Sequence, residues 1–189
     1  GVWNVPTLAT RLMLFEQDSA FAAYLRSANV PDQAVQRLLA SRRSIPFLRN
    51  FTAADFVAAK AGFAAQDSLV RALAGVGAGL MAGTDMAPAG FALHKELEVL
   101  VQAGLTPYQA LETATRNPAR FLGRNDGSGT VAAGSPADLV LLDADPLADI
   151  SNIRRIRGVV RRGGWLDRQA LDSLLSAEVR RVTGEPRRQ

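Results

Sequence analysis

Apolar residues recur at the spacing of an α-helix through most of the first 122 residues. Each of six segments shows this pattern or a helix-start signal, and we expect a helix in each of them: 9–26, 31–43, 52–73, 91–103, 106–115 and 117–122. Thr52 and Thr106 are the expected N-cap residues of two of these helices, and Pro107 suits a first helical position. We therefore expect this part of the chain to be mainly helical.

Two short segments interrupt the helices with a different pattern. Residues 2–8 are rich in β-branched and aromatic side chains, and residues 75–85 form an apolar run between glycines that ends at Asp85. A short run that is apolar on both faces is typical of a strand buried in a parallel sheet. The glycines precede the strand and lack the spacing G-x-G-x-x-G, which argues against a dinucleotide site.

The pattern changes again after Gly123. Short β-branched segments separated by glycine and proline turns predict strands over 129–131, 137–143 and 156–162, and Gly163-Gly164 is expected to make a tight turn into Trp165-Leu166. A last amphipathic helix is expected to begin at Gln169. The chain is therefore expected to be an α/β protein with two structural units.

Composition excludes several kinds of site. The 189 residues include no cysteine and one histidine, His94, so the chain has no disulfide framework, no thiolate metal site and no cysteine nucleophile. A catalytic zinc ion usually has three protein ligands, most of them histidines, which this chain alone cannot supply. No stretch approaches the roughly 18 apolar residues of a membrane helix, so we expect no membrane partner.

Basic residues are concentrated near the C-terminus. Residues 151–189 carry 10 Arg against 4 Asp or Glu, a net charge of +6, whereas the whole chain has a net charge of +4. A nucleic-acid site would place these arginines on one face beside aromatic side chains, and only Trp165 lies near them in the sequence. We favour a solvated face followed by a frayed tail, and we predict no nucleic-acid partner.

Asp85 is the first candidate for chemistry. A carboxylate at the C-terminal end of a buried strand lies at the sheet edge where α/β folds place ligands and catalytic groups. The alternative is that Asp85 caps a loop or the helix that begins near Gly90. Position alone does not separate the two explanations.

A series of motifs occurs in order along the second half of the chain. After Gly83-Thr84-Asp85 come GFALHKELE (90–98), AGLTP (103–107), ATRNPAR (114–120), GTV (129–131) and ADLVLLD (137–143). This succession closely resembles the C-terminal part of the amidohydrolase superfamily, particularly its imidazolonepropionase-like and dipeptidase-like members. The resemblance extends from about residue 76 to residue 175, and the strand at 2–8 also looks like a barrel strand of that family.

The resemblance implies a (β/α)8 barrel beside a small β-domain. This chain would hold the last strands and helices of the barrel in residues 1–122, and β-domain strands with a C-terminal helix and tail in residues 123–189. In such proteins the acid that ends the last barrel strand is a metal ligand and proton shuttle, which implies both roles for Asp85. The implied cofactor is zinc, as one or two divalent ions, which lower the pKa of bound water to about 7.

The resemblance also gives His94 a possible role. A histidine at this position lies near the mouth of the active site, which implies contact with substrate; the alternative is a surface histidine paired with Glu98 on the same helix face. Arg116 or Arg120 could bind a substrate carboxylate, although we favour an interdomain salt bridge.

The remaining metal ligands of the family belong upstream of Gly1. We therefore expect the N-terminal barrel portion to be missing from this chain, which begins like an internal segment and leaves a cytoplasmic or a periplasmic location open. In full-length form we expect a metal-dependent hydrolase that cleaves a C–N bond of a cyclic amide or small peptide, and we expect the 189-residue chain alone to be inactive. The alternative is a non-catalytic remnant or interaction module. Because an open part of a barrel exposes strand edges and apolar faces, the isolated chain should aggregate, dimerise or be found alongside its missing portion.

Overall fold

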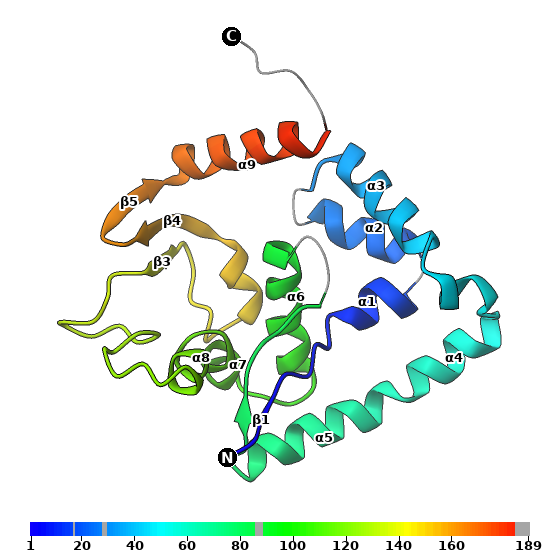
Figure 1. The fold of residues 1–189 in the computed structure, drawn as a ribbon, viewed down its shortest axis with the longest axis horizontal. Helices are drawn as coiled ribbons and strands as arrows, with labels where there is room; N and C mark the ends of the chain where they lie inside the picture. The colour runs from blue at the N-terminus through cyan, green and yellow to red at the C-terminus, as the bar shows by residue number, and fades with distance from the viewer. Residues whose placement is uncertain (17, 28–29, 86–88, 184–189) are drawn as a thin grey trace.

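The computed structural model describes residues 1–16, 18–27, 30–85 and 89–183 as helices, short strands and connecting loops (Figure 1). The elements, with η for a 3-10 helix, are β1 (Trp3–Asn4), α1 (Thr10–Phe15), α2 (Asp18–Ser27), α3 (Asp32–Arg43), η1 (Pro46–Asn50), α4 (Ala53–Ala61), α5 (Phe63–Gly75), β2 (Gly79–Leu80), α6 (Ala89–Gln102), α7 (Pro107–Ala114), α8 (Arg116–Phe121), β3 (Leu139–Leu142), η2 (Ile150–Arg154), β4 (Ile156–Arg161), β5 (Gly164–Asp167) and α9 (Arg168–Thr183). The chain is thus a mixed α/β protein. Within the described residues the parallel sheet has two strands and does not form a closed barrel.

Two predicted helix starts are confirmed in detail. The hydroxyls of Thr52 and Thr106 each accept a hydrogen bond from the backbone N–H of the third helical residue, Asp55 or Gln109. The side chains of those two residues accept a hydrogen bond from the N–H of the cap in return. This capping box satisfies amide groups that the first turn of a helix leaves without partners. Pro107 occupies the first position of α7, as predicted.

The prediction of a single helix over 9–26 is wrong. α1 ends at Phe15, Glu16 has an extended backbone, and α2 begins at Asp18. Arg42 of α3 stabilises this break, because its guanidinium donates to the carbonyl oxygen of Glu16 and pairs with the Asp18 carboxylate at 2.7 Å. The helical spacing of the segment is real, but contacts from a distant helix decide where it is interrupted.

The predicted helix over 52–73 is divided as well. α4 and α5 meet at Gly62, whose backbone stays in the helical region with φ −70° and ψ −17°. Figure 1 shows the two helices running end to end along one side of the molecule. Glycine is about 1 kcal/mol less favourable than alanine inside a helix, which accounts for an interruption at this position.

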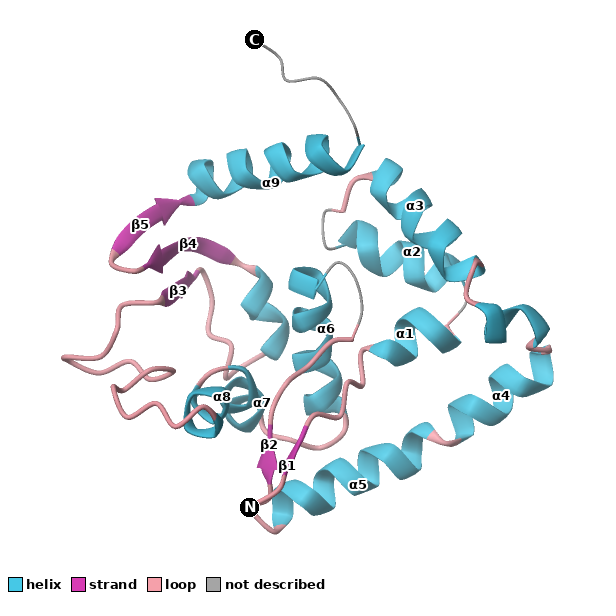
Figure 2. Ribbon diagram, viewed as in Figure 1, coloured by secondary structure: helices cyan, strands magenta, loops and turns pink. Residues whose placement is uncertain are grey.

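The two parallel strands are shorter than the sequence predicts. β1 pairs with β2, with Trp3 opposite Gly79 and Asn4 opposite Leu80, and Figure 2 shows the pair lying near one end of α5. A parallel strand within 75–85 is therefore confirmed, but only over two residues. In the described part of the chain each of these strands pairs with only one other strand. The outer edge of each strand therefore has no neighbouring strand to hydrogen-bond with.

The second sheet is antiparallel, in the order β3-β4-β5. Its strands β3 and β4 confirm the strands predicted over 137–143 and 156–162. The prediction of a strand over 129–131 is wrong, because the structure has no strand there. Gly127 and Gly129 have positive φ values of +77° and +80°, so the chain turns there. A Cβ atom at Gly129 would lie 2.5 Å from the carbonyl oxygen of Thr115, which shows how closely this turn packs on the junction of α7 and α8.

Buried apolar side chains form two clusters. The first joins β2, α5, α6, α7 and η2: Leu8, Val70, Leu80, Leu97, Val99, Leu100, Ala103, Leu105, Ala110, Ile150 and Ile153. The second joins α1, α2, α3 and α6: Ala9, Leu12, Phe21, Ala22, Leu25, Val30, Val35, Leu39 and Ala92. The segment after residue 123 thus contributes to the first cluster, and the division into units 1–122 and 123–189 stays a prediction.

The contact between the parallel strands gives a first expected result. A Cβ atom at Gly79 would lie 2.5 Å from the ring of Trp3, which also packs edge-to-face on Phe121. Gly79→Ala should therefore lower the free energy of unfolding by about 1–3 kcal/mol in a urea titration. Gly75→Ala is the matched control, since nothing lies within 4 Å of its Cβ position; equal stability of the two variants would contradict the expectation.

Candidate functional site

Asp85 lies in the loop on the carboxyl side of β2, which ends at Leu80. The preceding Gly83 packs so closely on Val5 that a Cβ atom would overlap the valine side chain, and the same position is 3.5 Å from Cγ2 of Thr7. The segment that leads to Asp85 therefore runs directly against the segment that follows β1. The Asp85 side chain is exposed, and its backbone has a left-handed φ of +44°.

The other side of β2 is fixed by helices α7 and α8. The backbone N–H of Ala82 donates to the carbonyl oxygen of Thr113 at 2.9 Å, and the side-chain amide of Asn117 donates to the carbonyl oxygen of Leu80 at the same distance. Thr113 is 1% exposed. The backbone between β2 and Asp85 is thus held from both sides.

His94 lies on α6 and is half-buried. Burial lowers the pKa of its imidazole below the usual 6.5, and the nearby Arg154 guanidinium lowers it further, while Glu98 opposes the change. Protonation of His94 is therefore disfavoured near neutral pH. The Glu98 carboxylate is bound by Arg154 at 2.6 Å and lies 3.8 Å from the Lys95 ammonium, so its interaction with His94 is shared with two cations.

Arg154 also connects α6 and η2 with α2, a contact that the sequence did not predict. Arg154 of η2 lies over the ring of Tyr24 in α2, 5.0 Å from the ring centre, and the Tyr24 hydroxyl donates to the carbonyl oxygen of Phe91 at 2.7 Å. Burial raises the pKa of Tyr24 to about 12. These contacts connect α2, α6 and η2, which are far apart in sequence, so no local sequence motif predicts them. By contrast, Arg116 pairs with Glu112 of the adjacent α7 and does not bridge two domains.

The predicted zinc ion can be tested against the donor groups. Within the described residues no group of three or more His, Cys, Asp or Glu side chains is placed to hold a metal ion. Asp85 is a suitable carboxylate ligand, but it is one donor, and a catalytic zinc site needs about three from the protein. These residues therefore do not make a complete metal site by themselves.

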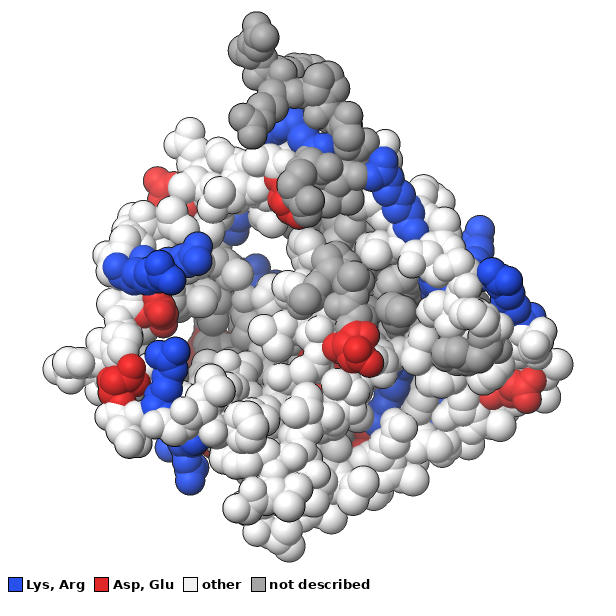
Figure 3. All heavy atoms as spheres, viewed as in Figure 1, with Lys and Arg blue, Asp and Glu red and all other residues white. Residues whose placement is uncertain are grey.

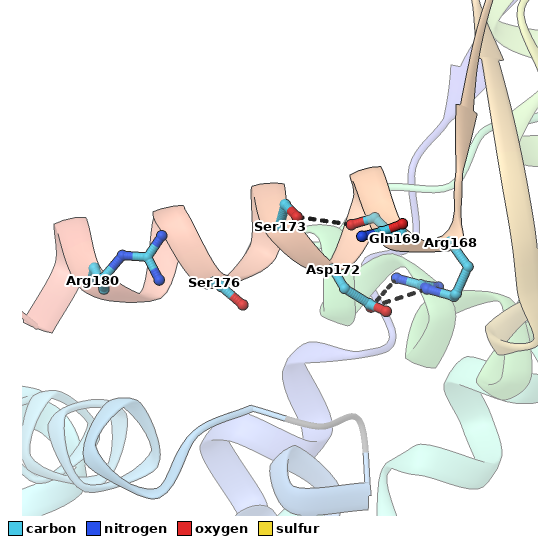
Figure 4. Close-up of a pocket in the computed structure, with 6 residues that line it drawn as sticks. All are labelled: Arg168, Gln169, Asp172, Ser173, Ser176 and Arg180. Carbon is cyan, nitrogen blue, oxygen red and sulfur yellow. Dashed lines mark hydrogen bonds and ion pairs between the residues drawn. The ribbon is translucent and has the colours of Figure 1, made fainter. Parts of the chain in front are cut away.

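One surface depression lies apart from Asp85 and His94. It has a volume of about 550 Å³, and Figure 4 shows that all of its lining side chains come from α9: Arg168, Gln169, Asp172, Ser173, Ser176 and Arg180. Arg168 and Asp172 are ion-paired across it at 2.7 Å. An open depression along one helix, apart from the strand ends, does not enclose a substrate.

Charge on the surface is distributed in separate groups. On the face shown in Figure 3, Lys and Arg side chains lie at several places with Asp and Glu between them. Two arginines of the basic C-terminal segment are ion-paired with carboxylates at 2.7 Å, Arg157 with Asp143 and Arg168 with Asp172. Among the described residues, no helix is both long enough and apolar enough to cross a membrane.

Comparison with known proteins identifies a family for more than half of the chain. Residues 62–166 match the family described as the amidohydrolase family, a range that includes Asp85 and His94. No curated protein sequence matches the chain.

Several solved structures resemble the fold. A Xaa-Pro dipeptidase with methionine bound in its active site has a TM-score of 0.52 and 20% identity, covering 88% of this chain and 35% of that chain. A prolidase complexed with N-methylphosphonate-L-proline has a TM-score of 0.52 and 24% identity, covering 89% and 36%. Molinate hydrolase has a TM-score of 0.51 and 26% identity, covering 88% and 33%. The chain thus spans about a third of the length of each of these structures.

Proposed function

Because the chain belongs to the amidohydrolase family, we propose that it is the C-terminal part of a hydrolase that cleaves a C–N bond of a cyclic amide or a small peptide. The observation that carries the proposal is the position of Asp85, inside the matched range and on the carboxyl side of β2, the parallel strand that ends at Leu80. Ligands and catalytic groups of barrel enzymes gather at this end of the strands.

Asp85 is the proposed proton carrier of this reaction. An exposed carboxylate can accept a proton from the attacking water and later deliver it to the departing amine, which would otherwise leave as an unstable anion. The close packing of Gly83 on Val5 fixes the backbone just before Asp85. This packing supports a fixed course of the backbone on the approach to Asp85.

A divalent metal, which we propose is zinc, would polarise the substrate carbonyl and activate the water. Asp85 would supply one ligand, and the other ligands would come from a part of the protein outside these 189 residues. His94 is the proposed substrate contact, because the lowered pKa of its imidazole keeps it neutral and able to donate or accept a hydrogen bond.

The function is tested with the full-length protein and a panel of amides. The panel contains Xaa-Pro dipeptides, dipeptides without proline, cyclic amides and molinate, because the fold resembles a dipeptidase, a prolidase and molinate hydrolase. We expect release of amine from at least one class, loss of activity after chelation, and recovery with zinc.

The 189-residue chain is the matched control for that experiment. Since its described residues do not complete a metal site, it should hold less than one tightly bound ion per chain and hydrolyse none of the panel. A full-length protein that retains no metal and cleaves none of the C–N bonds would refute the proposed function and favour a non-catalytic role.

A further inference from the structure

Glu96 is a buried carboxyl group for which the proposed chemistry has no use. Its side chain lies on α6 and is 0% exposed. One oxygen, Oε2, accepts a hydrogen bond from the backbone N–H of Ala9 at 2.6 Å, while Oε1 has no hydrogen-bond partner within the described part of the chain. Burying such a group costs stability, and an apolar side chain at this position would avoid that cost.

The residue that Glu96 holds belongs to a constrained turn. Ala9 is the N-cap residue of α1, and its side chain makes no capping hydrogen bond. Two residues earlier, Thr7 has a left-handed φ of +50°, which is uncommon for a side chain branched at Cβ. The carbonyl oxygen of Thr7 accepts hydrogen bonds from both the backbone N–H and the hydroxyl of Thr10, at 3.2 and 2.7 Å. A left-handed backbone at a β-branched residue is strained, and it persists only where several surrounding contacts hold it in place.

This turn is in direct contact with the segment that ends at Asp85. Gly83 packs on Val5 and lies close to the methyl group of Thr7. Asp85 has the same left-handed backbone as Thr7, so both segments bend sharply beside each other after the parallel strands. Displacing the turn would therefore displace the carboxylate of Asp85.

We propose that Glu96 is a positioning residue, whose carboxylate fixes the turn after β1 and thereby the direction of Asp85. The proposal rests on the proposed function of Asp85. A charged acceptor makes a shorter and stronger hydrogen bond to a backbone N–H than a neutral amide does, which explains an acid at this place. Burial raises the pKa of the Glu96 carboxyl group, and the backbone N–H groups of Ala9 and Leu8 together with the charge of Arg11 oppose that rise.

Three variants of the full-length protein test this role. They are Glu96→Gln, Glu96→Ala and the matched control Glu112→Gln, which makes the same chemical change on α7. With the substrate that the wild type hydrolyses best, kcat should fall about 100-fold for Glu96→Ala at unchanged KM, because a misplacement of about 1 Å has effects of this size. Glu96→Gln keeps an acceptor oxygen and should restore about tenfold of that loss. Glu112→Gln should keep the wild-type kcat.

Hydrogen exchange separates positioning from general destabilisation and needs no activity. In Glu96→Ala, peptides covering residues 5–12 and 79–85 should exchange faster, whereas a peptide from α9 should exchange as in the wild type. Unchanged exchange at 79–85, faster exchange throughout the chain, or an unchanged kcat would each overturn the proposal. If the wild type hydrolyses no substrate, the proposed function fails, and the exchange at 79–85 still decides whether Glu96 holds the Asp85 segment.

Discussion

The Asp85→Asn variant of the full-length protein should lose about a thousandfold in kcat while folding as the wild type does. Asparagine has nearly the shape of aspartate but cannot accept and return a proton at neutral pH. It also tolerates the left-handed backbone of Asp85, at φ +44°, far better than alanine does. The change therefore removes the proposed chemistry with little disturbance of the strand end.

The matched control for this variant is Asp172→Asn. It removes the same charge from α9, where Asp172 is exposed and paired with Arg168. Steady-state kinetics should show wild-type turnover for the control, and thermal unfolding should show similar stability for both variants. If Asp85→Asn kept kcat within a fewfold of the wild type, Asp85 would not carry the proton, and the metal-ligand assignment would lose its basis.

Leu100→Ala should lower the free energy of unfolding by about 2–5 kcal/mol. Leu100 is 0% exposed and lies in the core cluster that also contains Leu80 of β2 and Ile150 of η2. Removing the γ methine and the two methyl groups of Leu100 leaves a cavity that the surrounding side chains fill only in part. Since a domain has only about 5–15 kcal/mol in total, a large part of the stability would be lost.

Urea unfolding measures this loss, with Leu122→Ala as the control because Leu122 is 66% exposed. The control should change stability by about 0.5 kcal/mol or less. A single shared transition that shifts in Leu100→Ala would show that residues before and after 123 unfold together. Two transitions, only one of which shifts, would favour the predicted division at that residue. Equal effects of the two leucine variants would contradict the packing described for Leu100.

Features with a local cause were predictable from the sequence. The capping boxes at Thr52 and Thr106 depend on side chains three residues apart, so the motif and the structure carry the same information. The parallel strand within 75–85 was predictable from its short apolar run, although the structure pairs only Gly79 and Leu80 and the strand ends before Asp85. The antiparallel strands after residue 137 follow from β-branched runs between turn residues.

Features with a distant cause were not predictable. The break at Glu16 depends on Arg42, and the turn at Gly129 depends on contact with the backbone of Thr115. The tie between Glu96 and Ala9 joins residues 87 positions apart. Periodicity reports which face of a segment is apolar, but it does not report which partner will meet that face.

The sequence by itself determined the class of elements, the family to which its motifs belong and the acid at the strand end. The tertiary structure decided how far each strand pairs, where the first helix breaks and which buried carboxyl group holds the turn beside Asp85. The physical reason is range: caps and periodicity act over three to four residues, whereas pairing, desolvation and close packing depend on groups that only folding brings together.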